Sequence, residues 1–555
     1  MERIVAIISL LLSAQFLFSS NTDTSDVLRS VNILSEQAFN DTMLVDTTIQ
    51  QFEIYDITQK YGRYKMHLGN LAQPAYSIFY IANNNIGYRS GLDVFDDYLY
   101  TPEKINFVIQ RRPYSELIMR TGFGQMFILD AYHAQHLSKS LSFGASAHRT
   151  YSKGLFNAQK SSATSFEMHS VYNTRKKFYS LLLLFSVNNV KSQLNGGLED
   201  SIYSNNFLEP RATYQTRLNE TLNKIMRYDV VMRNEFSLIK SKNDTAAQYH
   251  LLKMGDEWSI FYNNHSYRDL NPSLSYYDTL YPFADSVVMD YEERTIQHAI
   301  YLNYENRLKP FMIWVKATHS NQEIGQNGFE KTMNDLKLSG MVSQKVNIKR
   351  AKASDHLSYL VKLNWIPIGI HKNDIHGSCD VNYNWNFNKY CAGLEFKYTN
   401  ASPAWNELYL FTNYMSWKNN FAKSENKTAS VYIHSIPYQT KVQFSYTLSK
   451  HLIYFDTSGK PVQWDRSVGL FQIRILKNFT FLKNFHLDND VAAGWGGNNV
   501  WSYPNISLKH SAYFGKYIFK GAMLSNFGIS ISYNSNFYVP AYNVTSESFL
   551  SAKKF

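Results

Sequence analysis

Hydrophobic and polar residues alternate along much of this chain. In the stretch LSFGASAHRTYSKG, residues 141–154, leucine, phenylalanine and two alanines occupy the odd positions up to 147, whereas serine, glycine and histidine occupy the even positions. Successive side chains of an extended strand point to opposite sides of a sheet. The stretch therefore predicts a strand with one apolar face and one polar face.

The same alternation recurs from about residue 75 onward, most clearly at residues 226–235, 485–495 and 526–534. Rougher examples occur at residues 114–122, 125–134, 163–174, 177–189, 245–254, 309–319, 337–348, 356–366, 406–416, 428–436, 439–448 and 468–477. Segments of ~9–13 residues have the length at which a tilted strand crosses a membrane. We therefore predict an all-β fold, a transmembrane antiparallel β-barrel of about 16 strands (roughly 14–18), with an even strand number. A barrel of that size encloses an aqueous channel.

Other parts of the chain alternate weakly. Residues 1–20, MERIVAIISLLLSAQFLFSS, have the apolar run and small residues of a secretory signal peptide. Residues 21–74 are polar and mixed, so we expect a periplasmic or lumen-associated segment before a barrel at residues 75–555. Residues 190–222 and 266–291 are predicted to be long loops, either at the surface or folded into the lumen.

Composition and charge fit this interpretation. The 555 residues include 41 Tyr and 36 Phe, which suit strands and the aromatic girdles of a membrane barrel. The strongest apolar run, residues 179–187, is too short for a membrane-spanning helix. The formal net charge is +11, but no segment gathers it into a stripe, so we expect no nucleic-acid partner. We assign the excess charge to the lumen and to a surface that faces lipopolysaccharide.

The two cysteines of this exported chain suggest a disulfide, but their parity argues against one. Cys379 shares the parity of the apolar Val381 and Trp385, whereas Cys391 has the parity opposite to Leu394. Residues paired across two strands share a face, so the thiols point to opposite sides unless a bulge shifts the register. We predict two reduced thiols.

Motifs for enzyme chemistry are missing from the sequence, which has no G-x-S-x-G, H-E-x-x-H, P-loop or dinucleotide fingerprint. The Gly-rich GWGGNN at residues 494–499 fits a hairpin turn. His133 and His136 would point to opposite faces of a strand, which disfavours a metal site there. The acidic run DVFDDY, residues 93–98, fits a solvated turn better than a calcium site. We therefore expect no catalytic, metal or cofactor site.

Charges on the polar parity of a strand would face the lumen of a barrel. On this basis we predict that the pore is lined by Arg120, His148, Arg227, Asp229, Arg233 and Glu235. Such charges bias the passage of ions, or they form ion pairs that only solvate the wall. If they tune the pore, then replacing both Arg227 and Arg233 with Glu lowers its preference for anions.

Several short elements in the first part of the chain occur in a distinctive order. They are Leu-Gly-Asn-Leu in HLGNLAQPAYSIFY (67–80), Pro113-Tyr114 at a strand start, the turn Ser152-Lys153-Gly154, and Gly-Gly at 196–197. This order resembles the putative porin family of Bacteroidetes outer membranes. The resemblance covers about residues 50–205 and returns at GISISYNSNFYVPAYN, 528–543. It implies an outer-membrane barrel, monomeric or oligomeric, with a porin-like role. The family pattern usually continues through further strands, whereas VTSESFLSAKKF remains here, so we expect early closure or a truncated chain.

Together these observations predict a non-enzymatic channel in the cell outer membrane for passive diffusion of small polar solutes or ions. Expected partners are outer-membrane lipid, lipopolysaccharide, the barrel assembly machinery, the solutes and a further copy of the chain. The alternatives are a barrel whose loops act as an enzyme or adhesin, a gated nutrient transporter, and a secreted soluble protein of several sheets. A TonB-dependent transporter is disfavoured because residues 21–75 are too short for its plug domain.

Overall fold

The computed structural model describes most of the chain after residue 53. The described residues are 29–31, 43–44, 54–60, 62–105, 107–109, 113–199, 211–239, 250–273, 276–277, 286–306, 310–348, 355–497, 500–521 and 523–551. Among them, no helix is long and apolar enough to cross a membrane.

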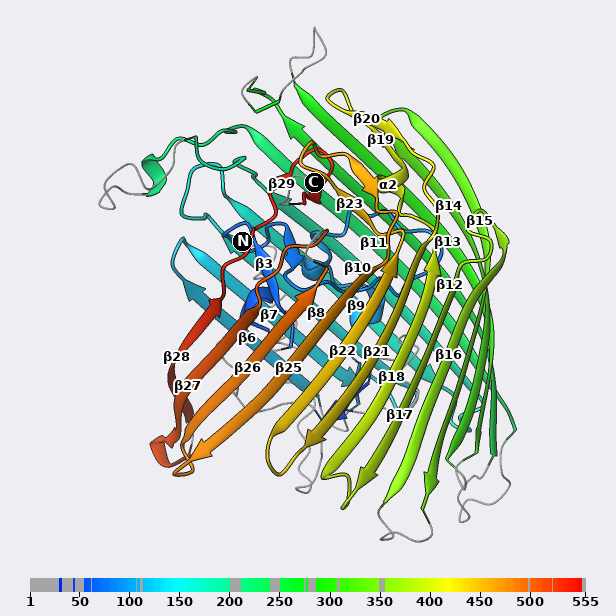
Figure 1. The fold of residues 1–555 in the computed structure, drawn as a ribbon. Helices are drawn as coiled ribbons and strands as arrows, with labels where there is room; N and C mark the ends of the chain where they lie inside the picture. Colours follow the sequence, from blue (N-terminus) through cyan, green and yellow to red (C-terminus); the bar gives the residue numbers. More distant parts are fainter. Residues whose placement is uncertain are drawn as a thin grey trace.

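Nineteen strands form one antiparallel sheet that curves round a central space (Figure 1). In chain order they are β6 (Tyr114–Gly122), β7 (Met126–His136), β8 (Leu141–Ser152), β9 (Ser161–Asn173), β10 (Tyr179–Ser192), β11 (Thr221–Ile239), β12 (His250–Asp269), β13 (Val287–Asn306), β14 (Phe311–Gln326), β15 (Phe329–Asn347), β16 (His356–Gly369), β17 (Ile375–Trp385), β18 (Tyr390–Ala401), β21 (Ser424–Ser435), β22 (Thr440–Lys450), β25 (Val468–Phe481), β26 (Phe485–Gly496), β27 (Ile506–Ile518) and β28 (Met523–Asn534). Strands that follow one another in this order are neighbours in the sheet.

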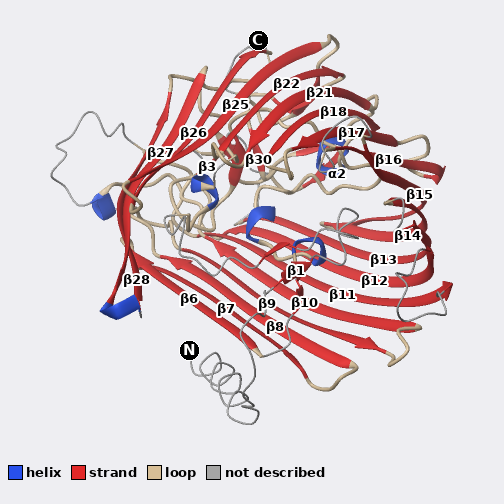
Figure 2. Ribbon diagram, turned by 90° about the horizontal axis from the view of Figure 1, so that it is seen from below, coloured by secondary structure: helices blue, strands red, loops and turns tan. Residues whose placement is uncertain are grey.

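The strand order also places β28 beside β6, so the two ends of the sheet come together (Figure 2). Each junction from β6 round to β28 has an antiparallel register, such as Leu184 opposite Val231 between β10 and β11. No register joins β28 to β6 within the described residues. Because every junction reverses the strand direction and the strand number is odd, β6 and β28 run in the same direction.

The strand number exceeds the 16 predicted from the sequence and is odd rather than even. The strands β11 to β13 have 19–20 residues each, so they continue well beyond a membrane-spanning length. As a result β12 extends to Asp269 and β13 begins at Val287, inside the stretch 266–291 that was predicted to be a loop. Conversely, the stretch 406–416 forms helix α2 (Trp405–Leu408) and the short strand β19 (Tyr409–Phe411) instead of a wall strand.

Alternation along the strands separates an outer face from an inner face, as β18 shows. Its outward positions from Tyr390 to Tyr398 are all apolar or aromatic, and Phe396 is 56% exposed. Its inward positions include Lys397 and Glu395, which form an ion pair at 2.7 Å. Aromatic side chains stand at the end of this outer face where β17 turns into β18, with 5.5 Å between the ring centroids of Trp385 and Tyr390.

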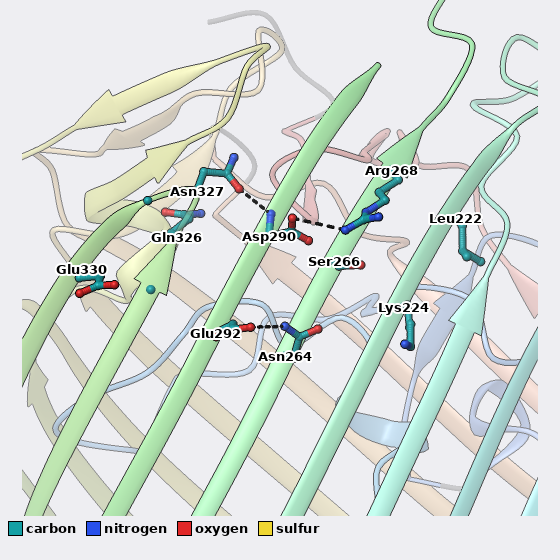
Figure 3. A pocket seen from close by; sticks show the side chains of 12 residues that line it. Leu222, Lys224, Asn264, Ser266, Arg268, Asp290, Glu292, Gln326, Asn327 and Glu330 are labelled. Atoms are coloured by element: carbon teal, nitrogen blue, oxygen red, sulfur yellow. Dashed lines mark hydrogen bonds and ion pairs between the residues drawn. The ribbon is translucent and has the colours of Figure 1, made fainter. Parts of the chain in front are cut away.

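The outer face becomes polar at one end of β11 to β15 (Figure 3). Lys224, Asn264, Arg268, Asp290 and Glu292 surround a shallow hollow of about 600 Å³ there. Arg268 pairs with Asp290 at 3.7 Å, and the Asn264 amide donates to Glu292 at 3.3 Å. The long strands therefore carry a polar collar beyond their apolar outer band.

The connections between strands differ at the two ends of the sheet. The four longest join β10 to β11, β12 to β13, β18 to β21 and β22 to β25, and the strand ends that they join all lie at the end that bears the polar collar. We call this end the long-loop end and the opposite end the short-turn end.

Cys379 and Cys391 are free thiols on neighbouring strands, which confirms the prediction from parity. Cys379 stands opposite Phe396 on the outer face. Cys391 lies on the inner face, where its thiol is 3.8 Å from the side-chain oxygen of Asn382.

Candidate functional site

The segment that precedes the first wall strand lies inside the curved sheet (Figure 2). We call residues 54–60, 62–105 and 107–109 the plug. It contains η2 (Ile57–Gln59), β3 (Lys65–His67), β4 (Ala75–Ser77), η3 (Asp96–Tyr98), η4 (Pro102–Lys104) and β5 (Phe107–Ile109). The predicted boundary at residue 75 falls within the plug, and the wall begins at Tyr114. The plug is thus built from the last part of the segment 21–75, which was judged too short to form one, together with the residues that follow it.

Apolar packing attaches one side of the plug to the last part of the wall. Tyr64, Phe79 and Tyr80 are buried against Leu470 of β25 and Ala492 of β26. The rings of Tyr64 and Phe79 meet edge to face, with 5.4 Å between their centroids. Burying a large apolar side chain contributes roughly 1.5–3 kcal/mol, so this cluster holds the plug firmly.

Three further apolar clusters attach the plug to the opposite wall. Phe95 and Leu99 pack with Ile225 on β11, and Leu92 packs with Ile324 on β14. A separate cluster joins Ile105 and Phe107 of the plug to Leu182, Leu184 and Val231. The plug therefore contacts strands on opposite sides of the lumen, and it cannot leave without exposing these side chains to water.

A buried cation fixes the first loop of the plug to β27. The Lys509 ammonium donates to the carbonyl oxygens of Thr58, Lys60 and Arg63 at 2.6, 3.1 and 2.9 Å. Lys509 is 7% exposed, so these three bonds replace the water that its charge would otherwise bind. Its nitrogen also lies 5.1 Å from the ring centroid of Tyr64, a cation–π contact.

The neighbouring strand β26 supplies the matching anion. Asp490 is fully buried and accepts a hydrogen bond from the Gly62 amide at 2.5 Å. The Tyr64 hydroxyl donates to the other carboxylate oxygen of Asp490. The guanidinium group of Arg474 on β25 also lies against this ring, 5.2 Å from the Tyr64 centroid. Charged groups from three wall strands thus surround one aromatic side chain of the plug.

The Leu-Gly-Asn-Leu element at residues 68–71 anchors the plug to the β8–β9 connection. The buried Asn70 amide donates to the Gln159 carbonyl at 2.7 Å and to the Ser161 hydroxyl at 3.0 Å. A Cβ atom at Gly154, whose φ is +81°, would lie 3.1 Å from the Asn70 amide nitrogen. The element and the Ser-x-Gly turn therefore meet in space although they are far apart in sequence.

Backbone contacts continue along the rest of the plug. The Tyr100 amide donates to the Asn188 side chain at 2.8 Å, and the Asn188 amide returns a bond to the Tyr100 carbonyl at 3.2 Å. The Gly87 amide donates to the buried Asp374 at 3.0 Å. Asp374 also accepts a bond from the Lys423 ammonium at 2.7 Å, so it ties the plug to a long connection of the wall.

The long connections themselves fold inward over the plug (Figure 1). Helix α2 approaches Gly91 closely, because a Cβ atom there would lie 1.8 Å from the Asn406 side-chain oxygen. The Asn406 amide instead donates to the Gly91 carbonyl at 2.8 Å. Two short hairpins, β19 with β20 (Ser416–Lys418) and β23 (Ile453–Phe455) with β24 (Pro461–Gln463), complete this cover.

Residues near the end of the described chain also enter the lumen. The strands β29 (Tyr542–Asn543) and β30 (Ser548–Phe549) form a small hairpin. Between them, the buried Glu547 accepts a bond from Asn223 at 2.8 Å and lies 3.1 Å from a ring nitrogen of His265. The Phe549 ring packs on Tyr76 of the plug, with 4.6 Å between centroids.

The six residues predicted to line a pore all lie on inward positions, but each contacts a neighbour. Asp130 accepts from Arg120 at 3.4 Å and lies 2.9 Å from a ring nitrogen of His148. The His148 ring stacks on Tyr100 of the plug at 3.7 Å.

The other four of these residues lie on β11. Arg227 pairs with the fully buried Asp229 at 2.8 Å. Arg233 pairs with Glu257 at 2.5 Å, and Glu235 pairs with Lys253 at 2.6 Å. All six therefore have ion-pair or hydrogen-bond partners on the inner wall, and their role in conduction stays a prediction.

The acidic run at residues 93–98 lies in the plug. Asp97 forms ion pairs with Lys65 and with Arg63, the latter at 3.7 Å. Enclosure by the wall, together with the nearby Asp93 carboxylate, raises the pKa of Asp96 to about 6. Within the described part of the chain, no group of three or more His, Cys, Asp or Glu side chains is placed to hold a metal ion.

Sequence reasoning missed the residues that hold the plug. The parity of β26 does place Asp490 inward, but nothing local indicates that its partners are Gly62 and Tyr64, more than 400 positions away. The only related signal in the sequence was that the Leu-Gly-Asn-Leu element and the Ser152-Lys153-Gly154 turn occur together in one chain. These two elements do meet in space.

Comparisons with solved structures show the same kind of fold. The chain is similar to the copper transporter OprC, with a TM-score of 0.56 and 8% identity, over 82% of this chain and 78% of that one. It is similar to the siderophore receptor PirA from Acinetobacter baumannii (TM-score 0.51, 8% identity, 77% and 69% covered). It is also similar to a variant of the ferric enterobactin receptor PfeA from Pseudomonas aeruginosa (TM-score 0.53, 8% identity, 80% and 71% covered). At such identities the likeness concerns the fold alone.

The sequence itself was compared with curated proteins and with protein families. No curated protein matches it. The family described as putative porin matches residues 31–554, which is nearly the whole chain. With its wall of antiparallel strands and its polar inner face, the chain belongs to the putative porin family.

Proposed function

We propose that this protein is a gated outer-membrane transport protein whose lumen is shut at rest by its own plug. Small polar solutes pass only when the plug shifts away from part of the wall. The observation that carries this proposal is the attachment of the plug to opposite sides of the lumen, through four apolar clusters and the buried Lys509. The proposal includes no catalytic step.

The outer face supports a place in a membrane. On β18 the apolar outward positions run from Tyr390 to Tyr398, which spans about 20 Å for a strand tilted by ~40°. This approaches the apolar band of outer-membrane barrels, and aromatic residues stand at both of its ends. Membership of a porin family and the likeness to solved transport proteins favour the outer membrane as the location.

Two further features are part of the proposal. Longer loops of such barrels face the cell exterior, so we place the long-loop end outside the cell. An open sheet edge is not tolerated in hydrocarbon, so we propose that β6 and β28 close the wall as a parallel pair in the membrane.

The passive channel predicted from the sequence is the competing function. It requires a water-filled path beside the plug, whereas the plug packs against strands on both sides of the lumen. The structural neighbours are named as a copper transporter and siderophore receptors, which favours a gated transporter over a permanently open pore. Their names do not identify the solute of this chain.

A reversible tether between plug and wall tests the proposal. The Asn70 amide nitrogen lies 3.0 Å from the Ser161 hydroxyl, so we choose these two positions for a pair of cysteines, whose disulfide is verified before transport is measured. Cys379 and Cys391 are first replaced by Ser, and arabinose uptake into proteoliposomes is measured before and after reduction. We expect uptake to rise on reduction, whereas the Ser161→Cys single variant shows no such change. Rapid uptake by the oxidised tether would contradict the proposal.

A further inference from the structure

A second hollow lies on the outer face of the wall, away from the plug. It spans β16, β17, β18, β21 and β22 and has a volume of about 720 Å³. Small residues form its floor, namely Gly377, Cys379 and Ala429. Large apolar side chains rise beside the floor, namely Val361, Leu363, Phe396, Tyr446 and Leu448.

The space above the floor of this groove is not filled by neighbouring side chains. A Cβ atom at Gly377 would have the Lys362 carbonyl at 3.8 Å and the Leu363 side chain at 3.9 Å as its nearest contacts. Leu363 is 50% exposed and Phe396 is 56% exposed, so the groove faces the surroundings of the wall. In a membrane these surroundings are hydrocarbon chains.

The end of the groove nearest the long loops is positively charged. Lys427 lines the groove there, and its ammonium lies 2.6 Å from Glu425 and 5.7 Å from the ring centroid of Tyr398. Lys450 lies 3.9 Å from the same carboxylate. Two lysines thus share one glutamate, which leaves one positive charge above an apolar groove.

This combination selects a ligand with a hydrocarbon chain and an anionic head. We propose that the groove binds one acyl chain of lipid A, the phosphorylated glycolipid of the outer leaflet, with a phosphate at Lys427 and Lys450. The chain lies over Gly377, Cys379 and Ala429, where it meets the apolar side chains on either side. The phosphate replaces Glu425 as the partner of at least one lysine. This inference rests on the proposed outer-membrane location and is independent of the plug.

The test measures binding of purified bis-phosphorylated lipid A to the full-length protein in detergent by native mass spectrometry. The variant Gly377→Leu fills the floor, and Lys427→Gln with Lys450→Gln removes the charge. Gly340→Leu on the outer face of β15 is the matched control, because a Cβ atom there also meets open space. Lys477→Gln controls for loss of a lysine near the short-turn end. We expect about tenfold weaker binding for the groove variants and unchanged binding for both controls.

The native thiol in the groove locates the ligand. In a Cys391→Ser background, lipid A should slow alkylation of Cys379 by N-ethylmaleimide about tenfold. Equal binding by Gly377→Leu and the parent protein, unprotected Cys379, or equally tight binding of phosphatidylglycerol would each overturn the assignment. The groove variants leave the lumen unchanged, so their arabinose uptake should match that of the parent protein. A failure of the gating proposal would appear in uptake and leave lipid binding intact.

Discussion

At the scale of single residues, Lys509 is the most informative contact between wall and plug. Hydrogen bonds from a charged group are worth ~1.5–3 kcal/mol each, and Lys509 donates three of them to plug carbonyls. The substitution Lys509→Met keeps an unbranched side chain, shorter by one heavy atom, and removes these bonds. We expect it to raise arabinose uptake by proteoliposomes at least about tenfold, because the seated plug loses stability.

The control for this substitution lies on the same strand. Lys516 is exposed near the short-turn end, and Lys516→Met should leave uptake unchanged. If Lys509→Met folds normally yet leaves uptake at the parent level, Lys509 does not hold the gate.

The Asp96 carboxylate makes seating of the plug depend on pH. Its pKa is raised to about 6 in the seated plug, from an ordinary value of 3.8, so the seated state binds the proton more tightly. Seating is therefore favoured as the pH falls through 6 and weakened as the pH rises above it. Lys104, Arg227 and His265 oppose this shift, and the side chain faces lumen water, so the effect is modest.

We accordingly expect uptake to decrease by a few fold between pH 7.5 and pH 5. In the Asp96→Asn variant, the uptake rate should stay near the low rate of the parent protein at pH 5 over this whole range, because asparagine mimics the protonated acid. A profile that is identical in parent and variant would show that another group sets the pH dependence.

At the scale of elements, wall strands could be predicted from the sequence where a lipid-facing side is apolar. The segment predicted at residues 114–122 is strand β6 itself. The pattern fails at the ends of β12 and β13, because there the outer face is polar, as Arg268 and Asp290 show, whereas the inner face carries buried apolar residues such as Met289. It also fails at residues 406–416, where alternating apolar residues such as Leu410 are buried in the lumen instead of facing lipid.

The plug could not be predicted from periodicity. Its buried residues, such as Leu92, Phe95 and Leu99, have no strand or long-helix period, because they pack against several different strands. Their partners lie far away in the sequence, so the site depends on the curvature of the sheet, which brings these strands round the plug. The inward direction of the six candidate pore residues could be predicted, whereas their ion pairs and the plug contact of His148 could not.

The polar collar on β11 gives a prediction at the same scale. Lys224 and Val230 lie on the same face of one strand, and the first belongs to the collar, whereas the second is in the apolar band. In intact cells, Lys224→Cys should react rapidly with a membrane-impermeant maleimide, and Val230→Cys should react at least about tenfold more slowly. Equal labelling of the two variants would place the membrane boundary elsewhere.

At the scale of the whole molecule, an odd number of strands determines how the wall closes. The strands β6 and β28 run in the same direction, so closure needs a parallel pair between the two ends of the sheet. Outward residues of β28 are unusually exposed, with Phe527 at 74% and Ile529 at 71%. This makes the junction of β6 and β28 the least covered part of the wall. The plug is held both by strands near this junction, β25 to β27, and by strands remote from it, such as β11 and β14.

The central claim is that the lumen is shut by the plug until the plug moves. Single-channel recording of the unmodified protein in a planar bilayer tests it most directly, with folding verified beforehand by heat-shifted migration on a gel. We predict long closed periods at low voltage with rare, brief openings, and frequent openings in Lys509→Met. Steady conductance from the moment the unmodified protein inserts would show a permanent path beside the plug and would contradict the account.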